Sequence, residues 1–374
     1  MATTGRKLRV GLFFGGRSAE HHISLDSALA VMTHLDADKY DVVPIGISRT
    51  GTWLPGISPA ALLASERVEG SEPKDQAVFA SAVDSSDRSR FMLEHFAQAL
   101  PVNHAIDVAF PVMHGAYGED GALQGLLEMA GIPYVGCGVI GSALGMDKEK
   151  MKLIFHAIGL LVVDSVAYRR QRWQRSPETI LDSVEKRLGY PCFVKPANCG
   201  SSIGVGKAYN RADLRTLIEA ATEYDSKIVI EHAIDCRELE CSVLGNCDPT
   251  VSVVGEVVTD HDFYDYHAKY LDDTSQINIP ADIPEALATV IREQAIQAFL
   301  ALDLSGLARV DFFLEKETDL LYINEVNTLP SFTPQCMYPR LCAVSGLSYT
   351  LLLDYLIELA LERHADRRRN RTCL

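Results

Sequence analysis

The chain has 374 residues, of which 47% are hydrophobic and 23% charged, a composition typical of a globular protein with a sizeable core. Its formal net charge of −15 at pH 7 argues against a nucleic-acid or anionic-membrane partner, because both bind basic surfaces. No apolar run approaches the length of a membrane span, and no secretory signal is recognised at the N-terminus. The nine cysteines are scattered without C-x-x-C spacing, which favours reduced thiols. We therefore expect a cytoplasmic protein of two or three domains.

The N-terminal segment predicts an open, mostly parallel α/β sheet. Its first strand ends in Gly15-Gly16, and a helix with apolar residues at helical spacing follows, with Ser18 or Ser24 as its N-cap. Residues 49–90 are rich in Ser, Pro and Glu, which predicts loop and short helix. We expect this first domain to span residues 1–137. Its predicted strands cover residues 8–14, 40–47 and 105–112.

The remaining chain predicts a central domain at 138–234 and a C-terminal domain at 235–374. A polar, aromatic loop at 260–278 has the composition of a lid that closes over a site, although a surface loop would look the same. The predicted helices cover residues 147–158, 177–188 and 284–302. The predicted strands cover residues 161–167, 191–195, 228–231, 239–244 and 252–258, followed by a hairpin at 308–314 and 321–330.

The C-terminal hairpin carries polar groups suited to a metal and an anion. Side chains alternate faces along a strand, so Arg309 and Asp311 share a face, as do Glu325 and Asn327. Pairing of the two strands would bring all four together. Two carboxylates and an amide oxygen suit Mg²⁺, and an adjacent arginine suits an anion beside the metal. A solvated hairpin face with ordinary ion pairs is the alternative.

Two glycine-rich segments are candidate phosphate sites. Residues 200–204 lie between two strands and offer backbone N–H groups that could cradle phosphates, whereas a plain flexible turn is the alternative. The pattern Gly136-x-Gly138-x-x-Gly141 formally matches a dinucleotide-binding motif. The strand before it is short and lies far from the N-terminal strand, which argues against a dinucleotide site there.

Charged side chains near these segments are candidates for a nucleotide site. Lys195 ends an apolar strand, so its charge must emerge at the strand's end, and Lys148 is a second candidate for ATP phosphates. Glu231 and Glu238 flank a turn where carboxylates could take an amine or ribose hydroxyls. Glu20 lies on the carboxyl side of the first strand, where α/β sheets place ligands. The alternative for the two lysines and for Glu231 and Glu238 is that they are ordinary solvated surface residues. The alternative for Glu20 is an acid that the dipole of the following helix favours.

Taken in order, these motifs resemble the D-alanine–D-alanine ligases of the ATP-grasp superfamily. The resemblance covers residues 10–363, and many ordered motifs with matching gaps are far more specific than any single one. It is carried by Gly15-Gly16-Arg17-Ser18-Ala19-Glu20-His21, His114-Gly115, Gly118-Glu119-Asp120-Gly121, Met146-Asp147-Lys148, Phe193-Val194-Lys195-Pro196, Gly200-Ser201-Ser202, Phe263-Tyr264-Asp265-Tyr266, Lys269-Tyr270, Arg309-Val310-Asp311 and Asn324-Glu325-Val326-Asn327-Thr328-Leu329-Pro330.

The resemblance implies a three-domain ATP-grasp fold, α/β at the N-terminus and α+β in the C-terminal part, with ATP gripped between the central and C-terminal domains. It implies that ATP phosphorylates the carboxylate of a first D-alanine. The amine of a second then attacks the acyl phosphate to give the dipeptide used in peptidoglycan synthesis. The expected small molecules are ATP, D-alanine and Mg²⁺ or Mn²⁺, and the expected assembly is a dimer through the N-terminal domain.

The resemblance also implies residue roles. Glu20 would bind the first ammonium and be linked through Ser201 to Tyr270, which closes the lid. Arg309 would stabilise the carboxylate and then the tetrahedral oxyanion, and His114 would help to position the first substrate. The metal ligands would be Asp311, Glu325 and Asn327. ATP would be held by Lys148, Lys195, Ser202, Glu231, Ala233, Ile234, Glu238, Phe263 and Lys269.

Two positions depart from the family pattern where the second substrate is expected. Ser331 replaces a glycine whose backbone N–H helps to bind the oxyanion, and a positive φ there would cost roughly 1 kcal/mol or more. Cys336 replaces a serine that contacts the second substrate's carboxylate, and a thiol is a weaker donor. These departures motivate the alternative of a paralogue with another second substrate, such as D-serine.

Tyr270 after Lys269 favours an amine over a lactate hydroxyl as the nucleophile. A non-catalytic nucleotide-binding homologue is a further alternative, against which the intact motifs argue.

Overall fold

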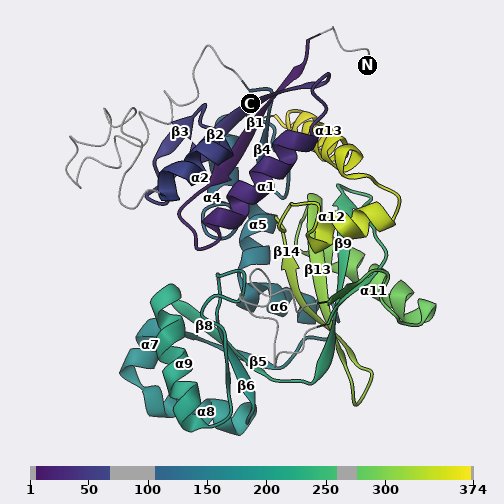
Figure 1. Cartoon of the computed structure of the whole chain (residues 1–374). Helices are drawn as coiled ribbons and strands as arrows, with labels where there is room; N and C mark the ends of the chain where they lie inside the picture. The colour runs from purple at the N-terminus through teal and green to yellow at the C-terminus, as the bar shows by residue number, and fades with distance from the viewer. Residues whose placement is uncertain (1–5, 68–105, 259–275, 372–374) are drawn as a thin grey trace, which may run out of the picture.

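The computed structural model describes residues 6–67, 106–258 and 276–371, and these residues form three sheets (Figure 1). The N-terminal sheet lies at the top of Figure 1, the C-terminal sheet below it, and the central sheet at the lower left. The predicted α/β class with an α+β C-terminal part is confirmed. Phe263, Lys269 and Tyr270, from the predicted lid, lie outside the described residues.

The N-terminal sheet has the order β3-β2-β1-β4, and β1 pairs in parallel with both β2 and β4, as predicted. The short edge strand β3 is antiparallel to β2. Strand β1 is buried from Val10 onward, as expected for a central parallel strand. The strands are β1 (Leu8–Gly15), β2 (Tyr40–Ile47), β3 (Trp53–Pro55) and β4 (Val108–Pro111). The helices are α1 (His21–His34), α2 (Pro59–Arg67), α4 (Ala122–Met129) and α5 (Val139–Met146).

The predicted N-cap of the first helix is wrong. Glu20 occupies the N-cap position of α1 and makes no side-chain cap. Ser24 lies inside the helix, where its hydroxyl donates to Val112 O and accepts from Gly15 N. The Ser18 hydroxyl accepts from the Glu20 N–H and so forms a turn before the helix. These hydroxyls satisfy backbone groups of the turn and of the strand ends, so they are not available to cap α1.

The central sheet has the order β5-β8-β6-β7 with antiparallel pairing throughout. The predicted strand 161–167 began too early, because Leu160 and Val162 pack on the core of the C-terminal sheet before β5 starts. Helix α9 was not predicted, although the side chain of Asn210 caps its first turn. The elements are β5 (Ser165–Arg169), β6 (Cys192–Pro196), β7 (Gly206–Ala208), β8 (Lys227–His232), α7 (Arg170–Arg175), α8 (Pro177–Arg187) and α9 (Arg211–Tyr224).

The C-terminal sheet has the antiparallel order β12-β11-β9-β13-β14, with β10 paired to β9. The predicted hairpin and the helices at 147–158 and 284–302 are confirmed, whereas the predicted strand 252–258 is shortened to β11. The strands are β9 (Cys236–Gly245), β10 (Thr250–Val251), β11 (Gly255–Val258), β12 (Gln276–Asn278), β13 (Gly306–Glu315) and β14 (Leu321–Asn327). The helices are α6 (Lys148–Ala157), α11 (Glu285–Ala301), α12 (Met337–Val344) and α13 (Tyr349–Arg367).

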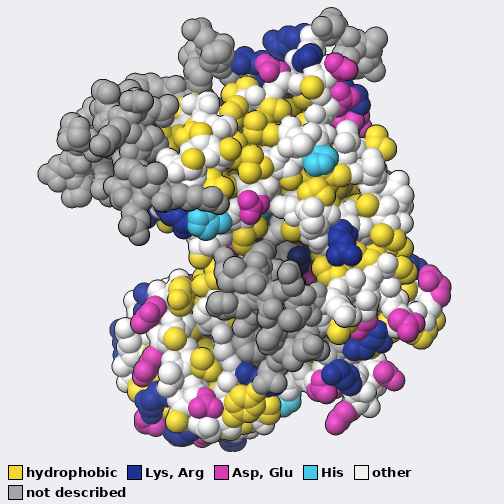
Figure 2. Space-filling view, viewed as in Figure 1, with side chains coloured by type: hydrophobic (Ala, Val, Ile, Leu, Met, Phe, Trp, Pro, Cys, Tyr) yellow, Lys and Arg dark blue, Asp and Glu magenta, His cyan; other side chains and the backbone are white. Residues whose placement is uncertain are grey.

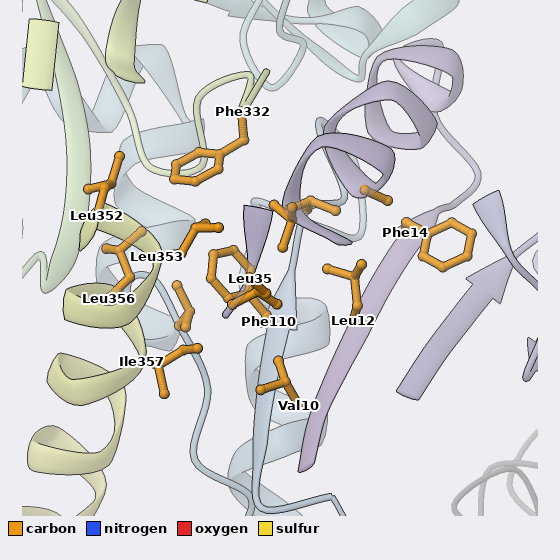
Figure 3. Packing of buried hydrophobic residues seen from close by; sticks show 14 of the residues in the cluster. Val10, Leu12, Phe14, Leu35, Phe110, Phe332, Leu352, Leu353, Leu356 and Ile357 are labelled. Atoms are coloured by element: carbon orange, nitrogen blue, oxygen red, sulfur yellow. The ribbon is translucent and has the colours of Figure 1, made fainter. Parts of the chain in front are cut away.

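The N-terminal sheet and the C-terminal helices share one hydrophobic core. Figure 3 shows Leu353 and Ile357 of α13 facing Val10 and Leu12 of β1, and all four side chains are buried. Arg363 of α13 donates to backbone carbonyls of the segment after the N-terminal sheet, and so pins the helix there. The predicted domain division stays a prediction; the shared core packs the predicted N-terminal and C-terminal parts against each other.

The surface of the protein mixes charges of both signs. In Figure 2, acidic and basic side chains are interspersed over the central and C-terminal parts. Within the described ranges, no single helix has the length and hydropathy needed to cross a membrane; α12 and α13 reach them only as a pair bent by 102°. The eight described cysteines are free thiols.

Candidate active site

A cleft of ≈ 860 Å³ lies between the central sheet and the C-terminal sheet. Its walls come from the loop after β6, the turn between β8 and β9, and the β13–β14 hairpin. All of the predicted nucleotide and metal residues that the structure describes line this one cavity, together with Ser201. They are Lys148, Lys195, Ser201, Ser202, Glu231, Ala233, Ile234, Glu238, Asp311, Glu325 and Asn327.

The hairpin brings its four polar residues together, as predicted. Arg309 stands opposite Asn327, and Asp311 stands opposite Glu325 in the antiparallel register. The register shifts directly after Asp311, so Asn324 is an extra residue of a bulge, a device common beside active sites. Nε and Nη2 of Arg309 donate to the two Asp311 oxygens at 2.7 Å each, and Asn327 Nδ2 donates to Asp311 at 2.9 Å.

Glu240 is a third carboxylate of this site that the sequence analysis missed. It lies on β9 directly opposite Asp311, and its Oε2 is 2.9 Å from Arg309 Nε. Burial opposes the charge of Arg309, but Asp311 and Glu240 outweigh that effect and raise its pKa well above the usual value. Glu238, a predicted site residue, and Glu240 are two residues apart on one strand and therefore share a face. This spacing could have indicated from the sequence that Glu240 belongs to the site.

The donor set of the hairpin fits a magnesium-type cation. Asp311 and Glu325 supply carboxylates, and Asn327, which donates through its Nδ2, leaves its carbonyl oxygen for a cation. Among the described residues, no group of three or more His, Cys, Asp or Glu side chains could hold a metal. Mg²⁺ suits this sparse set, because it is held by one or two carboxylates together with substrate phosphates rather than by an all-protein cage.

Three charges are buried together on the opposite wall. Lys195 Nζ donates to Glu231 Oε2 at 2.7 Å, and Lys152 Nζ lies 3.2 Å from Glu231 Oε1. Burial of Glu231 opposes its ionisation, but the two lysines outweigh this and lower its pKa to about 2. The sequence analysis did not identify Lys152 as a site residue. Its position one turn after Lys148 on α6 could have indicated that the two lysines share a face of the helix. An adenine or ribose role for Glu231 stays a prediction.

Lys148 lies between the two walls of the cleft. It is the first residue of α6, which Asp147 caps through the Lys150 N–H. Its Nζ donates to Cys199 O at 2.9 Å and lies 3.5 Å from Glu325 Oε2. The Lys148 ammonium therefore contacts both the backbone beside the glycine–serine loop and the candidate metal ligand Glu325. It is well placed to bind an anion that lies between them.

The glycine–serine loop between β6 and β7 holds Glu20. Ser201 and Ser202 both adopt left-handed backbone conformations, with φ of 48° and 56°. The Ser201 hydroxyl donates to the Glu20 carboxylate, which agrees with the first half of the predicted link; its second half, at Tyr270, lies outside the described residues. A Cβ on Gly200 would lie 2.9 Å from Glu20 Oε2, so a side chain there would displace the carboxylate that Ser201 binds. The loop is therefore bound in place rather than a plain flexible turn.

Glu119 is a second buried carboxylate beside Glu20, and it received no role from the sequence. It accepts from the Gly115 N–H at 2.7 Å, while a Cβ on Gly115 would meet Glu20 Oε2 at 2.5 Å. Burial raises the pKa of Glu119 well above its usual range, and the charge of Glu20 adds to the effect. Its place in the motif Gly118-Glu119-Asp120-Gly121 was the available signal.

Three residues expected near the substrates, His114, Ser331 and Cys336, are not among those that line the cleft. His114 is buried, with Nδ1 2.9 Å from Leu329 O and Nε2 3.0 Å from Ser27 Oγ. Ser331 is not among the described non-glycine residues with positive φ, so the anticipated strain is absent. Cys336 occupies the N-cap position of α12, and its Sγ lies 3.1 Å from a threonine hydroxyl.

The second glycine pattern has a packing role. Gly138 precedes α5, and a Cβ on Gly141 would lie 2.7 Å from the carbonyl oxygen of Asp303. Close approach of two backbones explains that glycine, in agreement with the argument against a dinucleotide site.

Comparisons with known proteins agree along nearly the whole chain. The family model described as D-ala D-ala ligase N-terminus matches residues 9–137, and the model described as D-ala D-ala ligase C-terminus matches residues 154–358. The D-alanine--D-alanine ligase of Acetivibrio thermocellus is 46% identical over 369 residues, covering 97% of this chain and 98% of that protein.

Solved structures agree with these matches. The VanG D-Ala:D-Ser ligase of Enterococcus faecalis aligns with a TM-score of 0.76 and 34% identity, covering 95% of this chain and 100% of that one. The D-alanine--D-alanine ligase of Bacillus anthracis complexed with ATP aligns with a TM-score of 0.72 and 27% identity, covering 97% and 99%.

Proposed function

The chain belongs to the D-alanine–D-alanine ligase family, and on that premise we propose that its cleft joins two D-alanines with conversion of ATP to ADP and phosphate. The observation that carries the proposal is the meeting of two walls around one cavity. The Asp311 and Glu325 carboxylates stand on one wall, where Arg309 pairs with Asp311 at 2.7 Å, and Lys195 stands on the other. Lys148 links them at 3.5 Å from Glu325.

The nucleotide would lie along the cleft between these walls. Lys148 and Lys195 would bind its phosphates, while Ala233 and Ile234 line the part of the cavity that adenine would fill. Glu238 would take the ribose hydroxyls. Mg²⁺ or Mn²⁺, held by Asp311, Glu325 and Asn327, would neutralise the phosphate charge that phosphoryl transfer develops.

The first D-alanine would lie between Glu20 and Arg309. Glu20, oriented by Ser201, would bind its ammonium. A carboxylate oxygen of this substrate attacks the γ-phosphorus, forming the acyl phosphate and releasing ADP. The deprotonated amine of the second D-alanine then attacks the acyl carbon. Arg309 and the backbone N–H of Ser331 would stabilise the oxyanion until the carbon–oxygen bond to phosphate breaks.

An assay of the purified protein tests this proposal. With ATP, Mg²⁺ and D-alanine, we expect equal amounts of D-alanyl-D-alanine and phosphate, measured by mass spectrometry and a phosphate assay. Asp311→Asn should abolish turnover, whereas Asp319→Asn, in the exposed turn of the same hairpin, should leave it unchanged. Phosphate release only with a different amino acid, or none at all, would refute the proposal.

A second candidate differs only in the second substrate. Cys336 stands where the family pattern has serine, and the chain aligns closely with a solved D-Ala:D-Ser ligase. Competition between D-alanine and D-serine at equal concentration distinguishes the two functions. The leading proposal predicts D-alanyl-D-alanine as the main product, and a majority of D-alanyl-D-serine would favour the second candidate.

We further propose a homodimer and a cytoplasmic location for the protein. Hydrophobic side chains gather over the N-terminal part in Figure 2, which supports a homodimer through that part. Light scattering should then give twice the mass of one chain. The free thiols of the eight described cysteines suit the reducing cytoplasm, where the substrates would also be met.

A further inference from the structure

The segment 329–332, which carries Ser331, is held by hydrogen bonds from the N-terminal part on both sides of that serine. Before it, Leu329 O accepts from His114 Nδ1 at 2.9 Å. After it, the Phe332 N–H donates to Ser27 Oγ at 3.1 Å. The Leu329–Pro330 and Ser331–Phe332 peptides are therefore bound by partners more than 200 residues away in the chain. The Pro330–Ser331 peptide, which carries the Ser331 N–H, lies between these two bound peptides.

The partners of His114 fix the direction of every proton in this network. A carbonyl oxygen only accepts, so Nδ1 of His114 carries the proton and donates to Leu329 O. Nε2 must then accept, and its partner at 3.0 Å is the Ser27 hydroxyl, which donates. The Ser27 oxygen keeps lone pairs, which receive the Phe332 N–H. One histidine and one serine thus bind the segment at two points.

Both residues are sealed from solvent. Ser27 is fully buried in α1, and His114, three residues after the end of β4, is 2% exposed. Burial lowers the pKa of His114 to about 4, so its ring is neutral at physiological pH, as the network requires. Neither ring nitrogen is left for a substrate, which differs from the first-substrate role expected for His114.

We propose that Ser27 and His114 are positioning residues that aim the backbone N–H of Ser331 at the oxyanion, and so couple helix α1 to the reaction centre. The inference rests on the proposed function, from which the oxyanion role of Ser331 is taken. Phe332 anchors the same segment by a second means, because its ring packs against Phe110 with centroids 5.9 Å apart. The packing of the Phe332 ring holds the segment in place, and the hydrogen bonds from His114 and Ser27 set the orientation of its backbone.

The chain offers a matched control for Ser27. Ser24 lies one turn earlier on α1, is equally buried, and also makes two hydrogen bonds. Its partners are Gly15 N and Val112 O, which belong to the N-terminal sheet and its margin. Ser24→Ala and Ser27→Ala therefore remove the same group from the same helix, but only Ser27→Ala releases the segment 329–332.

Binding of a phosphinate mimic of the tetrahedral intermediate, in the presence of ATP and Mg²⁺, reads out the position of the Ser331 N–H. We expect Ser27→Ala to weaken binding of the mimic and to lower kcat by roughly 10-fold to 100-fold, since small misplacements have effects of that order. The KM for ATP should stay unchanged. Ser24→Ala should change mimic binding less than about twofold, because its bonds do not reach the segment. Equal effects of the two variants, or none from Ser27→Ala, would overturn the inference.

Amide hydrogen exchange in the ligand-free protein separates this inference from the proposed function. Exchange of the Phe332 amide should rise in Ser27→Ala and not in Ser24→Ala, whether or not the protein makes dipeptide. A wild-type protein without ligase activity would refute the proposed function. An active wild type with unchanged exchange in Ser27→Ala would refute the inference. If Ser27→Ala does not fold, Ser27→Cys keeps the size of the side chain with a weaker donor and should show the same pattern at smaller amplitude.

Discussion

At the scale of single residues, the buried pairing of Glu231 with two lysines decides how Lys195 meets phosphate. Glu231 binds Lys195 at 2.7 Å and Lys152 at 3.2 Å, deep in the wall of the cleft. Because Lys152 shares the carboxylate's charge, Lys195 keeps positive charge to offer to the nucleotide. Lys152 therefore acts on ATP through Glu231 rather than by contact.

We predict that Lys152→Met raises the KM for ATP several-fold and lowers the free energy of unfolding by about 2 kcal/mol. The loss should stay below the range for a buried carboxylate left with no partner, because Lys195 remains. Steady-state kinetics and denaturant titration measure the two effects. Lys150→Met, on the same helix with half of its side chain exposed, is the control and should change stability by less than about 0.5 kcal/mol. An unchanged KM for ATP in Lys152→Met would count against this role.

Ser331 yields a prediction opposite to the one its family position suggests. Since its φ is not positive, glycine would relieve no strain there and would only add conformational freedom to the unfolded chain. We expect Ser331→Gly to lower the free energy of unfolding by about 0.5–1 kcal/mol, measured by denaturant titration. A more stable Ser331→Gly protein would contradict this reading of the backbone.

At the scale of elements, the segment 329–332 depends on a neutral histidine. The pKa of His114 is lowered from 6.5 to about 4 by burial, so the unfolded chain takes up a proton at a higher pH than the folded protein does. The stability contributed by the neutral ring is therefore complete above pH 6.5 and is lost as the pH falls towards 4. The shift corresponds to about 3 kcal/mol.

We predict that this pH dependence disappears when His114 is replaced by Gln, which cannot titrate. The difference in unfolding free energy between wild type and His114→Gln should shrink as the pH falls from 7 to 4. Taking the difference removes the opposite contribution of Glu119, whose raised pKa makes its protonated form favour folding at low pH. Denaturant titrations across this range provide the measurement, and parallel curves for the two proteins would contradict the account.

Elements with a strong local pattern could be predicted, and elements defined by distant partners could not. The hairpin of β13 and β14 and the helices α6, α8 and α11 matched, because their apolar periodicity is carried by neighbouring residues. The N-cap of α1 was misassigned because Ser24 bonds to strand ends brought close only by folding. The start of β5 was misplaced because residues before it pack on another sheet.

At the scale of the whole molecule, the site depends on contacts that no local pattern reveals. Lys152, Glu240 and Ser27 were missed, although the motif residues lining the cleft were found. Glu240 became a partner of Arg309 only once β9 lay beside β13. Ser27 and Phe332 are 305 positions apart in the chain. Because the N-terminal sheet and α13 share one core, such a contact can hold a fixed geometry.

The acyl phosphate is the central chemical claim, and isotope transfer tests it most directly. We would supply D-alanine labelled with ¹⁸O in both carboxylate oxygens, together with ATP and Mg²⁺, and analyse the released phosphate by mass spectrometry. Attack of the first carboxylate on the γ-phosphorus predicts one ¹⁸O in each phosphate, formed in step with the dipeptide. Dipeptide formation with unlabelled phosphate would contradict the account.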